Sequence, residues 1–185
     1  RDLVRSRGLG DVYKRQMRDN YMDCPDRERA QWWGDEVNEL GEAFYALSPS
    51  GQKLAVKGIH ELMNWQREDG TLYSPVPAGN WDKELPLQML ASIGWYGFYT
   101  QYYYSADSSF VPVIYDRMRR YLHEVWQVDK SGLVIERQGA WSWGDWGEHV
   151  DMGVLTNCWY YLALKAERAF ALQLGKDKDA DEISR

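Results

Sequence analysis

The sequence has few cysteines, few prolines and no long apolar run. Its two cysteines, Cys24 and Cys158, can build neither a disulfide framework nor a metal-spaced cluster. Six prolines beside 44% hydrophobic residues argue against disorder and for a globular domain with a sizeable core. No uninterrupted apolar run approaches the roughly 18 residues that a membrane span requires. We therefore expect no membrane partner.

Basic residues and histidines are also scarce. The 22 lysines and arginines are outnumbered by 28 acidic residues, which gives a formal net charge of −6. Because no basic stripe follows the chain, nucleic acid is not expected as a partner. The three histidines, His60, His123 and His149, lack the spacing of zinc ligands. We expect neither a metal nor another cofactor.

Aromatic residues, by contrast, are abundant. Ten tryptophans and thirteen tyrosines occur in 185 residues, and several stand in stretches with a loop-like composition. Large flat side chains serve cores, interfaces and sugar faces alike. For a single tryptophan, packing in the core is the commoner role.

Both ends of the chain have an artificial character. Residues 1–16 show no hydrophobic period, and residues 11–16 read as the translation of a transposon end used in preparing sequencing libraries. We interpret residues 1–16 as a cloning or assembly scar that packs on nothing. Residues 177–185 begin a further helix that stops without a cap. The expected domain therefore covers residues 17–185 and is truncated at both ends.

Four stretches carry apolar residues at spacings of three and four, which predicts helices with one buried face, whereas residues 84–105 are apolar nearly all round and predict a helix packed between others. The expected helices cover residues 35–47, 52–67, 84–105, 111–128 and 152–175, and a short strand is expected at 132–136. The predicted buried faces consist of Val37, Leu40, Phe44 and Leu47; Leu54, Ile59, Leu62 and Met63; Ile114, Met118, Tyr121, Leu122 and Val125; and Leu155, Trp159, Leu162, Ala166 and Phe170.

The connections between these helices are short on one side and long on the other. Two long ones, residues 71–83 and 139–149, are rich in tryptophan and acidic residues, and loops of this length tend to be functional. This rhythm is typical of stacked helical hairpins and favours an α/α toroid or an α-solenoid over a four-helix bundle. The lack of a sequence repeat weighs against a repeat array.

The segment from Asp23 to Asp35, DCPDRERAQWWGD, holds four carboxylates, two arginines and two tryptophans. One interpretation is a solvated turn in which Asp35 caps the next helix. The other is a glycosidase site, because glycoside hydrolysis needs one carboxylic acid to protonate the leaving oxygen and a second carboxylate to activate water or attack the sugar. Tryptophan walls raise the pKa of a carboxyl group, whereas nearby arginines lower it.

The pattern Asp-Cys-Pro-x-Arg-Glu-Arg-x-x-Trp-x-Gly-Asp in this segment closely resembles the signature of bacterial α-L-rhamnosidases, glycoside hydrolase family 78. The resemblance implies an all-α (α/α)6 barrel, truncated here, and inverting hydrolysis of terminal α-L-rhamnosides with Glu28 as the general acid. It places the general base beyond this chain, so the fragment alone is expected to be inactive. The implied sugar-binding residues are Asp23, Arg27, Trp32 and Asp35, and looser similarity adds Trp81, Asp145 and Trp146.

Three alternatives compete with this interpretation. Another (α/α)6 hydrolase, acting on glucosides, fucosides or unsaturated uronides, would share the hairpins and the aromatic loops. A non-catalytic carbohydrate-binding or scaffolding domain would need the tryptophans but not Glu28. A helical interaction domain would bury Trp81, Trp141 and Trp146 away from any shared cleft.

Overall fold

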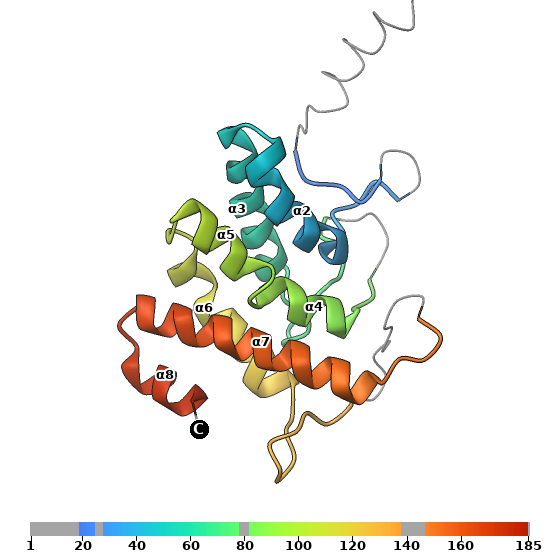
Figure 1. Cartoon of the computed structure of the whole chain (residues 1–185), viewed down its shortest axis with the longest axis vertical. Helices are drawn as coiled ribbons and strands as arrows, with labels where there is room; N and C mark the ends of the chain where they lie inside the picture. Colours follow the sequence, from blue (N-terminus) through green and yellow to red (C-terminus); the bar gives the residue numbers. More distant parts are fainter. Residues whose placement is uncertain (1–18, 25–27, 78–81, 138–146, 185) are drawn as a thin grey trace, which may run out of the picture.

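The computed structural model describes residues 19–24, 28–77, 82–137 and 147–184, and these residues form helices joined by loops (Figure 1). In chain order the helices are α2 (Trp33–Ala46), α3 (Pro49–Asn64), α4 (Pro86–Ile93), α5 (Phe98–Ser105), α6 (Val111–Arg120), the π-helical turn η1 (Tyr121–Val125), α7 (Met152–Gln173) and α8 (Asp177–Ile183). Bridges between extended segments are isolated within these ranges. The prediction of an all-α fold is confirmed. None of the described helices is long and apolar enough to cross a membrane.

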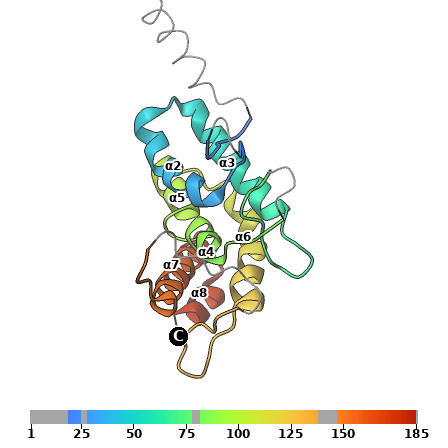
Figure 2. The ribbon, with the colours of Figure 1, turned by 90° about the vertical axis from the view of Figure 1, so that its right-hand side faces the viewer.

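The described helices form three hairpins, and the first helices of these hairpins run in the same direction. Short connections join α2 to α3, α5 to α6 and α7 to α8, whereas residues 65–85 and 126–151 make the longer connections. Helices α2, α4 with α5, and α7 run side by side in one direction (Figures 1 and 2). The contacts that show this direction pair Trp33 with Ser92, Asn38 with Tyr96, Phe44 with Tyr104, Trp95 with Leu162, and Tyr102 with Gln173. The long connections therefore meet at the N-terminal ends of α2, α4 and α7. This agrees with the prediction that short and long connections lie at opposite ends of the helices.

The core lies between these parallel helices and their hairpin partners. Trp33, at the start of α2, is completely buried and meets Phe98 of α5 edge to face at 5.6 Å between ring centroids. Burial of each such side chain contributes about 1.5–3 kcal/mol. Most predicted core positions are buried, but seven are only partly covered: Phe44, Leu47, Leu54, Val125, Leu155, Trp159 and Leu162.

The single helix predicted over residues 84–105 is wrong. It is broken into α4 and α5 between Gly94 and Gly97, where α7 lies against the backbone. A Cβ added at Gly94 would stand 2.6 Å from the Leu90 carbonyl oxygen and 3.0 Å from the Cα of Ala163. The amide of Trp95 leaves its own helix and donates to the Leu162 carbonyl at 3.2 Å. The close approach of α7 thus ends a stretch that is otherwise helical in composition.

Gly94→Ala is therefore expected to destabilise the protein by about 1–3 kcal/mol, because the new methyl group must displace backbone atoms. The matched control is Gly41→Ala in α2, where a Cβ meets nothing within 4 Å. That change should stabilise the helix by about 0.5–1 kcal/mol. Urea denaturation of both variants measures the difference. Equal stability of the two would show that α7 does not constrain Gly94.

The short strand predicted at residues 132–136 is also wrong. Val134 forms only an isolated bridge with Val128, and its amide donates to the side-chain oxygen of Asn157 on α7 at 2.8 Å. Gly132 has φ +82°, which bends the chain there into a turn. The preceding helix was predicted to reach Val128 but ends at Val125. The hydrogen bond from the Val134 amide to Asn157 of α7 therefore takes the place of the backbone pairing that a strand would make.

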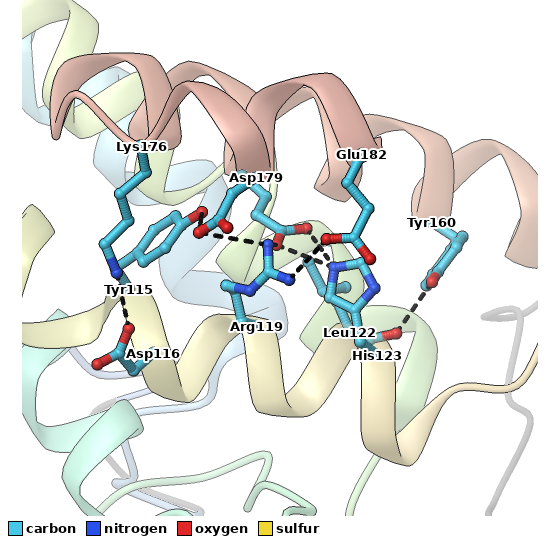
Figure 3. Close-up of polar contacts among 10 residues, drawn as sticks. Tyr115, Asp116, Arg119, Leu122, His123, Tyr160, Lys176, Asp179 and Glu182 are labelled. Carbon is cyan, nitrogen blue, oxygen red and sulfur yellow. Dashed lines mark hydrogen bonds and ion pairs between the residues drawn. The ribbon is translucent and has the colours of Figure 1, made fainter. Parts of the chain in front are cut away.

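The predicted final helix is present as α8, and an ionic network attaches it to α6 and α7 (Figure 3). At its centre the Glu167 side chain, which has no exposed surface, accepts from Arg119 Nη1 at 3.2 Å and lies 2.9 Å from His123 Nε2. Arg119 also reaches Asp179 and Glu182 of α8, at 3.7 and 3.5 Å. One buried carboxylate thus links three helices.

Candidate active site

Hydrogen bonds between Asp23 and Ala30 close the motif around Glu28 into a loop. The amide of Asp23 donates to the Ala30 carbonyl at 3.0 Å, and the amide of Ala30 donates to Asp23 Oδ1 at 3.0 Å. Arg29 completes the reversal with φ +52°, a left-handed conformation that costs a non-glycine residue on the order of 1–3 kcal/mol. Such strain persists only where surrounding bonds impose it. These bonds hold the exposed Glu28 next to Asp23 and Cys24.

Glu28 and Cys24 bond each other reciprocally. The Glu28 amide donates to Cys24 Sγ at 3.3 Å, and the thiol donates to Glu28 Oε2 at 3.8 Å. Donor atoms of Asp23, Cys24 and Glu28 all lie within 4.8 Å of one another. Among the described residues this is the one group of three such side chains close enough to hold a metal ion, and its members also hydrogen-bond to one another.

The charge state of Asp23 is set by this cluster. Partial burial raises the pKa of Asp23, but hydrogen bonds from Glu28, Cys24 and the amides of Ala30 and Cys24 outweigh it and lower the pKa below 3.8. A carboxyl group can donate a hydrogen bond to another carboxyl group only while it holds a proton. The cluster therefore favours the charged form of Asp23.

The rest of the motif pairs with the first half of the long loop at residues 71–83. Trp32 and Pro75 form an antiparallel bridge, and the amide of Trp33 donates to the Ser74 carbonyl at 3.0 Å. Trp32 is half-buried, and Asp35 lies exposed in the first turn of α2. The structure therefore brings Asp23, Glu28, Trp32 and Asp35 to the N-terminal end of α2, where the long connections meet.

Four predicted site residues lie outside the described part of the chain: Arg27, Trp81, Asp145 and Trp146. The Trp141 of the competing interpretation lies outside it as well. In the first long loop, Pro77 and Asp82 flank residues 78–81, which lie outside the described part of the chain. The Pro77 carbonyl accepts a hydrogen bond from the amide of Gln31 at 3.4 Å. The chain therefore enters that loop beside the motif.

Two glutamates near the motif were missed by the sequence reasoning. Glu36 is 1% exposed, and neither of its carboxyl oxygens has a hydrogen-bond partner in the described structure. Burial first, and then the charges of Glu39 and Glu61, raise its pKa well above the ordinary value. Glu36 continues the buried stripe of Leu40 and Ala43 at helical spacing, and this was the signal in the sequence.

Glu39 stands one turn beyond Asp35 and connects the buried glutamate to the site. Burial, followed by the charges of Asp35, Glu42 and Asp23, raises its pKa to about 7. Because both motif aspartates act on it, Glu39 lies within electrostatic reach of the Asp23–Glu28 pair. It adds a carboxyl group that changes its charge near neutral pH to the wall of the site.

The described residues thus form an all-α domain of helical hairpins with a cluster of carboxyl groups at the end where the long connections meet. Residues 11–184 match the family described as the bacterial α-L-rhamnosidase six-hairpin glycosidase domain. The chain belongs to this family, and the resemblance drawn from the motif is confirmed. The match includes residues 11–16, which lie in the segment interpreted as a scar. No curated protein and no solved structure matches the chain significantly.

Proposed function

We propose that this domain hydrolyses terminal α-L-rhamnosides by an inverting mechanism in which Glu28 is the general acid. The observation that carries the proposal is the loop that holds the Glu28 carboxyl group in a hydrogen bond with Asp23. A general acid must hold its proton until the glycosidic oxygen takes it. The exposed position of Glu28 leaves it accessible to such an oxygen.

In the proposed reaction, Glu28 protonates the glycosidic oxygen as the bond from that oxygen to the anomeric carbon breaks. A water molecule attacks the opposite face of the sugar and gives its proton to a base carboxylate roughly 6.5–9.5 Å from the acid. The family resemblance puts that base in a part of the domain that this chain does not include. Glu28 ends the step as a carboxylate, and solvent protonates it again.

The remaining motif residues supply sugar contacts in this proposal. Asp23, Arg27 and Asp35 would bond the hydroxyl groups of rhamnose, since carboxylates accept from hydroxyl donors and arginine donates to hydroxyl oxygens. Trp32 would stack on the apolar face of the ring. The expected contacts from the long loops come from Trp81, Asp145 and Trp146.

The test compares hydrolysis of an aryl α-L-rhamnoside by the complete six-hairpin protein and by its Glu28→Gln variant. Glutamine keeps the shape but has no proton to give, so kcat should fall by at least about 100-fold while circular dichroism stays unchanged. Glu68→Gln, at an exposed glutamate outside the motif, is the matched control and should keep full activity. An active Glu28→Gln variant would place the acid elsewhere. Cleavage of another α-glycoside, but of no rhamnoside, would make the domain a different six-hairpin hydrolase.

A further inference from the structure

The loop that carries Glu28 has two stems, and side chains of α3 bind both of them. Residues 19–22 lead into the loop before Asp23, and residues 31–33 leave it after Ala30. The bonds between Asp23 and Ala30 close the loop on itself, but they join it to no helix. The position of Glu28 relative to the helices therefore depends on the contacts of the two stems.

Lys57 of α3 binds the first stem. Its ammonium group donates to the Asp19 carbonyl oxygen at 2.9 Å and to the side-chain oxygen of Asn20. The next residue, Tyr21, is buried, and its hydroxyl donates to the Gly51 carbonyl oxygen in the first turn of α3 at 3.2 Å. The first stem is thus attached to α3 at two places, and the Lys57 contact is the one that lies at the surface.

Gln31 binds the second stem to the same helix. Its side chain is buried, and its Nε2 donates to Glu61 Oε2 of α3 at 3.3 Å and to the Val76 carbonyl oxygen. Gly58 leaves room for this side chain, because a Cβ there would stand 2.8 Å from Gln31 Oε1. The amide of Val76 donates to the Gln31 carbonyl oxygen at 3.1 Å, so Gln31 also holds the long loop at residues 71–83.

An ion pair on α3 joins these two attachments. Lys57 Nζ and Glu61 Oε1 lie 2.7 Å apart, and the two side chains are 45% and 25% exposed. An ammonium group has three donors, and Lys57 directs two of them to the first stem and one to Glu61. The other carboxyl oxygen of Glu61 accepts from Gln31. A continuous chain of polar contacts therefore runs from one stem of the loop to the other.

We propose that the Lys57–Glu61 pair positions Glu28 by holding the two stems of its loop together on α3. Both residues lie outside the motif and act through the loop, so they are positioning residues and not catalytic ones. The inference rests on the proposed function for the role of Glu28 as the acid. Because an exposed ion pair adds little to global stability, the pair acts on the loop more than on the fold.

Alkylation of Cys24 by iodoacetamide measures the loop in this chain. The thiol bonds to Glu28 in the closed loop and is half-buried, so local opening makes it more reactive. In a Cys158→Ser background, which removes the second free thiol, Lys57→Met should raise the rate about tenfold, as the loss of two hydrogen bonds implies. The loss of a positive charge by itself would favour the less reactive thiol form and slow the reaction. A faster rate therefore reports opening of the loop.

Two further variants separate the loop from the fold. Lys57→Arg keeps the charge and the donors, so it should restore the slow alkylation of Cys24. Lys53→Met, at an exposed lysine one turn earlier in α3, is the matched control and should leave the rate unchanged. The urea midpoint should be the same in all of these proteins. An unchanged alkylation rate in Lys57→Met would overturn the proposal, and so would a faster rate accompanied by an equal loss of global stability.

The complete six-hairpin protein tests the effect on catalysis. Lys57→Met should lower kcat for an aryl α-L-rhamnoside about tenfold, and Lys57→Arg should restore it, because a displaced acid transfers its proton more slowly. Full activity of Lys57→Met would overturn the positioning of Glu28 even if the loop opens. A wild type that cleaves no rhamnoside would overturn the proposed function, and the alkylation of Cys24 would still decide whether the pair holds the loop.

Discussion

Replacing Glu167 by leucine is expected to lower the free energy of unfolding by about 3–5 kcal/mol. The carboxylate is completely buried and meets Arg119 and His123 at 3.2 and 2.9 Å, so its removal leaves their polar nitrogen atoms without the main acceptor. Because Arg119 also holds Asp179 and Glu182, the attachment of α8 should weaken at the same time. Urea denaturation gives the loss, and hydrogen exchange in α8 gives its location.

The matched comparison is the exposed pair of Lys176 and Asp116, whose nitrogen and oxygen lie 3.1 Å apart. Asp116→Ala should cost less than about 1 kcal/mol, because solvent screens an exposed ion pair. The double variant Arg119→Met with Glu167→Leu should recover part of the loss, since neither charge is then left without the other. If Glu167→Leu were no more harmful than Asp116→Ala, the buried carboxylate would not hold the three helices together.

The second large effect concerns pH. Glu36 and Glu39 have pKa values raised above the ordinary 4.5, so the folded protein binds their protons more tightly than the unfolded chain does. Their favourable contribution is complete below about pH 4.5 and is lost as the pH rises through the folded values. For Glu39 the difference between 4.5 and about 7 corresponds to ~3 kcal/mol. Stability should therefore fall between pH 5 and pH 8.

Glu39→Gln and Glu36→Gln should each raise the stability at pH 8 and flatten this decline, because glutamine does not ionise. Urea denaturation at pH 5, 6.5 and 8 measures the slope. Groups with lowered pKa values, such as Asp69 and Asp107, keep their full contribution above about pH 4 and do not disturb this window. Glu68→Gln, at an exposed glutamate outside α2, is the control. A wild type with equal stability at pH 5 and pH 8 would contradict the prediction.

Glu39 also gives the candidate site a means to respond to pH. Its charge changes near neutrality, and the carboxylates of Asp35 and Asp23 contribute to its raised pKa. Deprotonation of Glu39 would add a negative charge close to Asp23. Like charge makes a neighbouring carboxyl harder to ionise. The carboxylate of Asp23 thus stands in an electrostatic field that varies over the same pH range as the stability.

Much of the fold followed from local periodicity. The buried stripes of α2, α3 and α6 were predicted from spacings of three and four, and the alternation of short and long connections was confirmed in the three hairpins. The break at Gly94 was not, because α4 and α5 have the composition of a single helix. Only the close approach of the α7 backbone, which is distant in the sequence, imposes it.

In the candidate site, too, some features could be predicted from the sequence and others arise only in the folded chain. Residue types and order alone were enough to select the motif from Asp23 to Asp35 and to relate it to a family of glycosidases, because this chemistry requires carboxyl groups in a shaped loop. The lowered pKa of Asp23 depended on the folded loop, where Asp23 accepts bonds from Glu28 and Cys24. The raised pKa of Glu36 likewise required its burial against α3. The spacing and order of residues within short segments determine the helices and the motif. Burial, shifted pKa values and close backbone contacts arise only when segments that are distant in the sequence pack together.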